Sequence, residues 1–272
     1  MSIKEPVYAI DATVIDLCLN VFWWGKFRKH KAAVKLHTML DVKTNIPTFI
    51  YVTSGAVHDV NALDVFPIEA GSYYVMDKGY IDFGRLHRIH QSSAFYVTRA
   101  KDNMSFVRLS SHAVDKSTGV KCDQTIRLKN KKAFLSHPAK IRRIKFYDSD
   151  IEMEFVFITN NFEISALEVA RLYKYRWAIE LFFKWIKQHL KVKTFWGYSM
   201  NAVKTQVYIA MITYLMVAIV KHQLKLKQSQ YEILQILSIS LLCKTPLLEL
   251  FSNAYPQYVK EQETNQLNLF GL

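Results

Sequence analysis

Three carboxylates stand out because each lies beside or within an apolar segment. Asp11 ends or interrupts the run VYAID, and Asp77 closes the run YYVMD. Acidic residues are poor strand formers, so their position here calls for an explanation. Glu180 belongs to LYKYRWAIELFFKWIKQHL (172–190), where aromatic and basic residues surround it. If these side chains meet, their oxygens form the hard ligand set that Mg²⁺ or Mn²⁺ prefers.

The chemistry open to such a site is phosphoryl transfer. Two divalent ions about 3.5–4 Å apart can clamp the attacking and the leaving oxygen of an in-line displacement. One ion makes the attacking water or 3′-hydroxyl more acidic, and the other stabilises the leaving oxygen. Lys and Arg beside the ions would hold the phosphates of the scissile strand. A nucleic acid is therefore the expected substrate.

The segment around Glu180 has the spacing of one amphipathic helix. At about 100° per residue, Arg176, Glu180 and Lys187 lie within about 60° of Tyr173. Glu180 then lies at the shoulder of the buried face, where a carboxylate needs a partner. The simpler alternative is an i,i+4 salt bridge between Arg176 and Glu180 on a solvated surface. The buried face would consist of Leu172, Ile179, Phe183, Ile186 and Leu190.

Each aspartate also has a simpler interpretation. Asp11 can cap the segment that follows it, and Asp77 can cap or turn the chain into KGY. The two carboxylates meet only if the strands at 7–11 and 73–77 are neighbours in one sheet. A helix packed beside that sheet would then bring Glu180 to the same place.

The elements that must position these residues follow from the apolar pattern. The first three strands are expected to form an antiparallel meander, and His58 or Asp59 to begin a short helix. Together the elements predict an α/β fold with a mixed sheet. Strands are expected at 7–19, 32–42, 48–55, 72–77 and 94–100, with helices near 58–66 and 82–91.

The second half changes character twice. Residues 104–159 predict a β-rich insertion, and Ser165 with Glu168 has the capping-box pattern that opens a long helix to residue 190. The rest is helical to about 245. The apolar run 207–220 is short for a membrane span and predicts a buried core helix. The expected division is a discontinuous core (1–103 and 160–245), the insertion (104–159) and a polar tail (246–272).

Charge and composition favour a polyanionic partner. The chain has 272 residues, and 36 basic against 23 acidic residues give a net charge of +13. Basic residues cluster at 26–35, 127–132 and 140–145, which suits phosphates, although each cluster alone is typical of a solvated face. No lipidation signal or obvious amphipathic anchor indicates a membrane partner.

Three scattered cysteines and a charged N-terminus favour a reducing, cytoplasmic location, associated with the nucleoid.

The combination of motifs resembles a known family. Tyr173, Arg176, Glu180 and Lys187 match Y-x2-R-x3-E-x6-K, the signature of one branch of bacterial insertion-sequence DDE transposases. AIDATVIDL looks like the first-aspartate region of that branch. YVMDKGYIDF looks like its second, with the D-x-G-Y form at Asp77. The resemblance runs from about residue 7 to about residue 245.

The resemblance implies an RNase H-like fold, with flanking helices and a β-rich insertion in the 180 − 77 = 103 residues between the second Asp and the Glu. It implies Asp11, Asp77 and Glu180 as ligands of two Mg²⁺ ions, for which Mn²⁺ can substitute. The implied reaction is cut-and-paste transposition: water nicks the transposon end, the freed 3′-hydroxyl forms a hairpin that is reopened, and the 3′ ends join target DNA. Expected contacts to double-stranded DNA come from Tyr173, Arg176, Lys184, Lys187 and Lys191.

Several expectations about the whole protein stay open. A homodimer on DNA is a family expectation. Because Asp11 comes so early, no N-terminal DNA-binding region of domain size precedes it, and we expect a truncated copy or a fragment of a longer protein. One alternative is an inactive DNA-binding remnant that inhibits full-length transposase. Another is a structure-selective nuclease on the same fold, although the signature around Glu180 argues against it.

Overall fold

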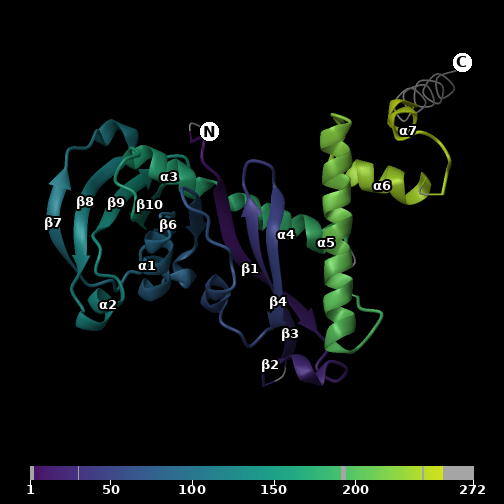
Figure 1. The fold of residues 1–272 in the computed structure, drawn as a ribbon, viewed down its shortest axis with the longest axis horizontal. Helices are drawn as coiled ribbons and strands as arrows, with labels where there is room; N and C mark the ends of the chain where they lie inside the picture. The colour runs from purple at the N-terminus through teal and green to yellow at the C-terminus, as the bar shows by residue number, and fades with distance from the viewer. Residues whose placement is uncertain (1–2, 30, 191–193, 241, 254–272) are drawn as a thin grey trace, which may run out of the picture. The chain divides into compact units, whose positions relative to one another are not determined.

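The computed structural model describes residues 3–29, 31–190, 194–240 and 242–253. The chain divides into two compact units, residues 1–206 and 207–272. The first unit contains all strands of the described residues, in one ten-stranded sheet ordered β2-β3-β1-β5-β6-β10-β9-β8-β7, with β4 paired to β3 (Figure 1). A mixed α/β fold was expected from the sequence, and it is confirmed.

The N-terminal half of the sheet combines an antiparallel meander with two parallel strands. β3 pairs antiparallel with both β1 and β4, as predicted. β5 runs parallel to β1, and β6 runs parallel to β5. β1 is thus central to this half, and its carboxyl end meets that of β5. The strands are β1 (Val7–Leu17), β2 (Lys26–Arg28), β3 (Lys31–Asp41), β4 (Ile46–Ser54), β5 (Tyr73–Met76) and β6 (Phe95–Arg99).

The stretch from 104 to 159 is β-rich, as predicted, and continues the same sheet. β10 pairs antiparallel with β6, and β9, β8 and β7 follow, each antiparallel to its neighbour. The predicted boundaries between core, insertion and tail stay a prediction. The elements are β7 (Phe106–His112), η4 (Lys116–Thr118), β8 (Val120–Leu128), α2 (Lys131–Ser136), β9 (Ile141–Asp148) and β10 (Met153–Thr159).

The two faces of the sheet follow from the alternation of side chains along a strand. Ile10 and Met76 point into the main hydrophobic cluster, which α1 covers with Leu86 and Ile89. The residues that follow, Asp11 and Asp77, therefore belong to the opposite face. The covering elements on the first face are η2 (Asp59–Asp64), η3 (Lys78–Tyr80) and α1 (Phe83–Gln91), and η1 (Trp23–Gly25) follows β1.

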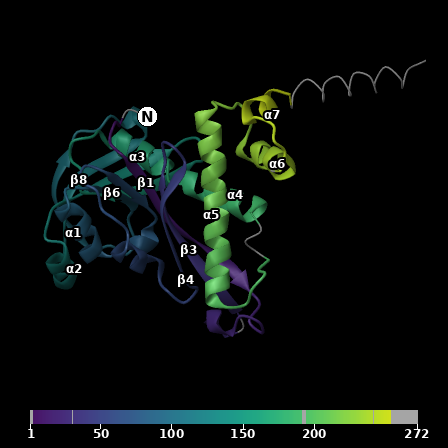
Figure 2. The same ribbon diagram turned by 45° about the vertical axis from the view of Figure 1, so that its right-hand side comes forward.

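Two helices rather than one lie on the opposite face. α3 (Ala166–Lys174) and α4 (Trp177–His189) follow one another along the sheet (Figure 2). The capping box of Ser165 and Glu168 is confirmed. The expectation of one long helix is wrong, because Tyr175 and Arg176 interrupt it. Their N–H groups bond to carbonyls three residues earlier, so the chain tightens into a 3₁₀-type turn there.

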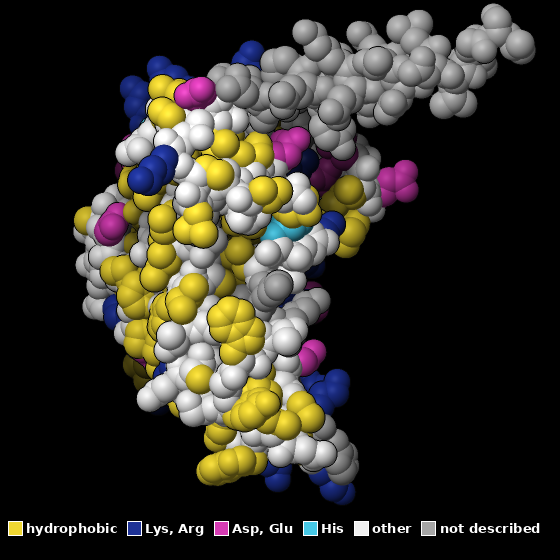
Figure 3. Space-filling model, turned by 90° about the vertical axis from the view of Figure 1, so that its right-hand side faces the viewer, with side chains coloured by type: hydrophobic (Ala, Val, Ile, Leu, Met, Phe, Trp, Pro, Cys, Tyr) yellow, Lys and Arg dark blue, Asp and Glu magenta, His cyan; other side chains and the backbone are white. Residues whose placement is uncertain are grey.

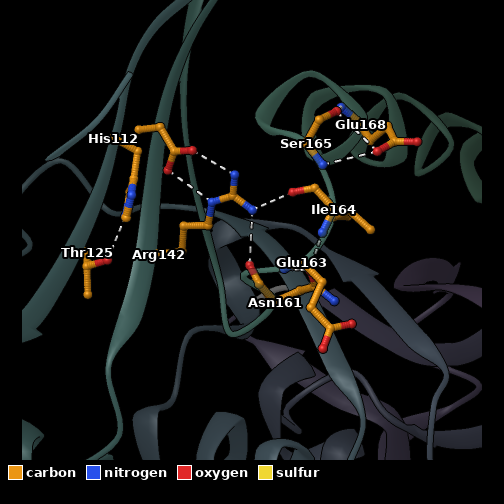
Figure 4. A network of polar contacts seen from close by, with 9 residues as sticks. His112, Thr125, Arg142, Asn161, Glu163, Ile164, Ser165 and Glu168 are labelled. Atoms are coloured by element: carbon orange, nitrogen blue, oxygen red, sulfur yellow. Dashed lines mark hydrogen bonds and ion pairs between the residues drawn. The ribbon is translucent and has the colours of Figure 1, made fainter. Parts of the chain in front are cut away.

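A buried ion pair fixes the connection into α3 (Figure 4). The Arg142 guanidinium donates Nε to Asp123 Oδ1 at 2.9 Å and Nη2 to Oδ2 at 2.6 Å. Its Nη1 donates to the carbonyl oxygens of Ile164 (2.6 Å) and Asn161 (3.3 Å). Asn161 in turn donates its amide to the Tyr73 hydroxyl at 3.1 Å. The start of α3 is thus tied to β5, β8 and β9.

The described part of the second unit is helical. It contains most of α5 (Met200–Gln223), with α6 (Gln230–Ser240) and α7 (Leu247–Asn253). Val217 on α5, Ile233 and Phe251 form a small apolar cluster. The prediction that 207–220 is a buried helix holds for one side only, because Ile212 and Met216 are exposed.

Among the described helices, α5 alone is long and apolar enough to cross a membrane, and 39% of its most apolar window is buried inside the protein. A core helix meets the same criterion, so length and composition give no membrane assignment here.

Candidate active site

Strand register brings the two aspartates together. Ile10 of β1 pairs with Met76, the last residue of the parallel strand β5, so Asp11 and Asp77 each come directly after this pair. Asp77 ends its strand, as expected. Asp11 does not: β1 continues for 17 − 11 = 6 residues beyond it. β3 pairs with all of this continuation, which keeps the strand extended past the carboxylate.

Arg176 links the first aspartate to Glu180. Its Nη1 donates to Asp11 Oδ2 at 3.4 Å, and its Nη2 donates to Glu180 Oε1 one helical turn away. The arginine side chain is 17% exposed, against 24% for Asp11 and 33% for Glu180. The salt bridge between Arg176 and Glu180 expected as the simpler alternative is present, and it includes a third group from the sheet. Glu180 therefore lies at the aspartates and not on a free helix surface.

Burial makes the charge on Asp11 costly. It raises the pKa of this carboxyl to about 6, against the lowering effect of the Ala12 N–H and of Arg176; Glu180 and Asp77 raise it further. Two more carboxylates thus act on Asp11. Nε of Arg176 is buried and has no hydrogen-bond partner among the described residues. The guanidinium therefore does not use all of its hydrogen-bond donors at this site.

Two tyrosines complete the surroundings. The Tyr173 hydroxyl donates to Asp77 Oδ1 at 3.4 Å, and burial raises its pKa to about 12, so it stays protonated. The Tyr80 side chain is 2% exposed. Burial, with Asp11, Asp59 and Asp77, holds the pKa of Tyr80 well above its usual range. Its buried hydroxyl lacks a hydrogen-bond partner in the described part of the chain.

The side chains as they stand do not form a ready metal cage. No three His, Cys, Asp or Glu side chains within the described ranges are arranged to hold an ion. At the candidate site, Arg176 supplies the positive charge that Asp11 and Glu180 contact.

A comparison with protein families decides what kind of protein this is. The family model described as "Transposase DDE domain" matches residues 2–216. The chain belongs to this family. The match covers β1, β5 and α4, the elements that carry Asp11, Asp77 and Glu180.

Individual relatives of this DDE transposase domain agree. A Sinorhizobium fredii protein named as transposase y4zB is 35% identical over 215 residues, 77% of this chain and 59% of the relative. A probable transposase for insertion sequence element IS5377 of Geobacillus stearothermophilus is 31% identical over 218 residues, 78% of this chain and 56% of the relative. The chain thus spans less than two thirds of the length of these relatives.

Among solved structures, the piggyBac transposase synaptic complex with hairpin DNA is similar in fold. The TM-score is 0.53 at 11% identity, and the match covers 95% of this chain and 57% of that chain. At this identity the likeness concerns the fold alone.

The lysines expected to contact DNA follow Glu180 on the DDE transposase domain. Lys184 is exposed on α4, and Lys187 is half-buried in its last turn, where a cation also suits the helix dipole. Lys191 lies outside the described residues.

The expected helix start at His58–Asp59 is confirmed. η2 does begin at Asp59, but no side-chain cap bond is made there. The Asp59 carboxylate instead forms a 2.9 Å ion pair with Lys35, a largely buried lysine of β3.

Sequence reasoning missed this Lys35–Asp59 pair, and it gave no role to Tyr80. The signal for Tyr80 was its place in D-x-G-Y. Nothing in the local sequence around Lys35 indicates burial of its side chain.

Proposed function

We propose that this DDE transposase domain cuts and joins DNA by metal-dependent phosphoryl transfer, with Asp11, Asp77 and Glu180 as ligands of two Mg²⁺ ions, or Mn²⁺ in their place. The observation that carries the proposal is the adjacent register of the two aspartates together with the Arg176 bridge to Glu180. One arginine balances a single negative charge. A purely structural ion pair therefore does not require three acidic groups from distant parts of the chain.

The residues suit divalent cations. Their donors are carboxylate oxygens, which Mg²⁺ and Mn²⁺ prefer. The Arg176 guanidinium already stands as a cation between two of them. Burial raises the pKa of Asp11, and Glu180 and Asp77 raise it further, so a bound cation would offset the repulsion among the three carboxylates. When bound, the ions would acidify the attacking hydroxyl and stabilise the leaving oxygen.

The chain's own groups have defined tasks in this scheme. The Tyr173 hydroxyl orients Asp77 through its hydrogen bond. Arg176 would turn from the carboxylates to a strand phosphate, which its planar fork can bind through two hydrogen bonds. Lys184 and Lys187 follow Glu180 at i+4 and i+7 on α4 and would continue that phosphate contact along the helix. Lys191 would extend the same basic stretch.

The reaction would begin with hydrolysis at a transposon end and continue with attack of the 3′-hydroxyl on target DNA, as in the signature branch that the motif matches. Double-stranded DNA as partner is supported by the net charge of +13. An RNase H-like core is supported by the strand order β4-β3-β1-β5-β6, with β5 and β6 parallel to β1. A homodimer on DNA and a cytoplasmic, nucleoid-associated location complete the proposal.

A plasmid assay tests the function. The chain is incubated with supercoiled plasmid and with a labelled 3′-hydroxyl duplex, in Mg²⁺, in Mn²⁺ and in chelator. We expect nicking and joining only with a divalent ion, and neither with Asp77→Asn, which should still bind DNA. Nicking by Asp77→Asn at the wild-type rate would refute the assignment. Binding without any metal-dependent cleavage by the wild type would favour the inhibitor alternative.

A further inference from the structure

A cluster of aromatic rings lies at the far end of β1 from the carboxylates. Phe22, which is 6% exposed, forms its centre. The rings of Trp24, Phe195 and Tyr198 meet it edge-on, with centroids 5.8–6.1 Å away. Residues 22–24 and 195–198, which are distant in sequence, thus form one aromatic cluster within the first compact unit.

This cluster is pinned by hydrogen bonds. Trp24 Nε1 donates to the Tyr198 carbonyl at 2.7 Å. The Gln206 side chain accepts from the Trp196 N–H at 3.2 Å and donates to the Thr194 carbonyl at 2.7 Å. Gly197 allows the close turn, since a Cβ there would come within 2.6 Å of the Ala202 Cβ. The loop is held in place by these contacts and by the rings around Phe22.

The pinned unit nevertheless presents large rings to solvent. Trp196 is 87% exposed, Trp23 77% and Tyr198 64%. Large aromatic side chains are usually well covered in a folded protein, because each has much apolar surface to bury. Exposed rings on a backbone fixed by these contacts suit a flat partner, since the loop loses little conformational freedom on binding.

The sequence segments that carry these rings contain basic residues and no acidic ones. No Asp or Glu occurs between Asp16 and Asp41, or between Glu180 and Glu232. Four basic residues that follow Trp23 in the sequence have exposed side chains: Lys26, Arg28, Lys29 and Lys31. Hydrophobic and basic side chains lie together at the lower end of Figure 3, the end at which Figure 1 places β2.

We propose that Trp23, Trp196 and Tyr198 form a stacking platform for unpaired bases of a DNA strand whose phosphates the neighbouring lysines and arginine hold. Exposed rings beside cations are the combination by which proteins bind single strands, because every base offers a flat face. Leu17 lies six residues after Asp11, about 20 Å along β1. The rings follow that end of β1, so the platform is separate from the carboxylate site. The inference relies on the proposed function only for DNA as the polymer.

Binding of the full chain to a labelled oligothymidylate of about 12 nucleotides tests the platform, measured by anisotropy and by quenching of tryptophan fluorescence. We expect Trp196→Leu and Trp23→Leu each to weaken single-strand binding about tenfold. Trp196→Tyr, which keeps a ring, should bind nearly as the wild type does. Leu135→Ala is the matched control, because it removes a 68% exposed side chain from α2, away from the rings.

Further arms separate stacking from charge. Lys29→Ala should lower the salt dependence of single-strand binding by about 0.7 in log–log slope and leave fluorescence quenching in place. Duplex of the same length should lose less than twofold with Trp196→Leu, because its bases are already stacked. Wild-type affinity of Trp196→Leu for the single strand would overturn the proposal. If that variant also loses self-association in sedimentation, the patch is instead a contact between copies of the chain.

The outcome is separable from that of the active-site proposal. If the wild type nicks plasmid and Trp196→Leu binds the single strand normally, the proposed function stands and the platform proposal fails. A chain that binds single strands through its rings but never cleaves has the platform without the enzyme.

Discussion

Two arginines of the first unit hold carboxylates in opposite ways. Arg142 meets Asp123 through two parallel hydrogen bonds of 2.6–2.9 Å, with both side chains 7% exposed, and its Nη1 donates to two backbone carbonyls. Arg176 reaches Asp11 only at 3.4 Å, also contacts Glu180, and leaves its buried Nε without a partner in the described residues. The first pair is complete, and the second is not.

The difference separates structure from function. A fully hydrogen-bonded buried pair has nothing to gain from a new partner, and breaking it leaves a charge stranded. An arginine that faces more acidic groups than it can satisfy leaves a site that favours additional cations. We infer that Arg142 holds α3 against the sheet, whereas Arg176 holds a place that divalent ions and DNA phosphates compete for.

Breaking the ion pair at each arginine should give opposite results, and the effect on activity at Glu180 is the largest. Glu180→Gln should lower the nicking rate by about 10³-fold or more, because a lost metal ligand removes several kcal/mol of transition-state stabilisation. Its thermal midpoint in chelator should stay near the wild-type value. Metal-dependent plasmid nicking and calorimetry check both parts. A nicking rate within tenfold of wild type would contradict this assignment.

At the complete pair, stability should change and chemistry should not. Arg142→Ala should lower the free energy of unfolding by about 3–5 kcal/mol, because Asp123 remains buried without its partner. Urea denaturation measures the loss. The matched control is Arg142→Met with Asp123→Leu, which removes both charges and should recover most of the stability. If Arg142→Ala is as stable as the wild type, the pair does not anchor α3.

Removing the competing cation should sharpen the contrast further. Arg176→Met leaves Asp11 and Glu180 without their guanidinium, so we expect Mn²⁺ to bind about tenfold more tightly at neutral pH. Duplex DNA should bind more weakly, because a phosphate contact is lost. Calorimetric titration gives the first value and anisotropy the second. Weaker Mn²⁺ binding would show that Arg176 supports the ion site and does not compete for it.

The pH dependence of Asp11 gives the smallest effect. Because its folded pKa is raised to about 6 and the unfolded value is about 3.9, stability in chelator is greatest below pH 4 and falls as pH rises towards 6. Asp11→Asn lacks this titration. The variant should therefore match the wild type near pH 4 and melt a few degrees higher at pH 7. A difference in melting temperature that does not vary with pH would contradict the burial of this charge.

Much of the site could be predicted because its parts are local in sequence. The carboxylates at Asp11 and Asp77 follow or interrupt apolar runs, and the Glu180 segment has its own spacing. The strand at 7 follows from an apolar, β-branched run, that at 32 from loose alternation and that at 48 from the turn before it. The capping box follows from Ser165 and Glu168.

What could not be predicted depends on tertiary contacts. The turn at Tyr175 and Arg176 contains neither Gly nor Pro, the usual marks of a helix break. The extension of β1 past Asp11 depends on pairing with β3, and the burial of Lys35 depends on Asp59 in another segment. The exposed side of α5 is as apolar as its buried side, so periodicity could not distinguish the two.

The central claim is that Asp11, Asp77 and Glu180 share divalent cations, and counting bound Mn²⁺ tests it most directly. Electron paramagnetic resonance of free Mn²⁺, titrated against the wild type and against Asp11→Asn, Asp77→Asn and Glu180→Gln, gives the number and affinity of the bound ions. We expect saturable binding to the wild type, and much weaker binding to all three variants while each remains folded. Equal binding by the wild type and any one of the three would contradict the shared site.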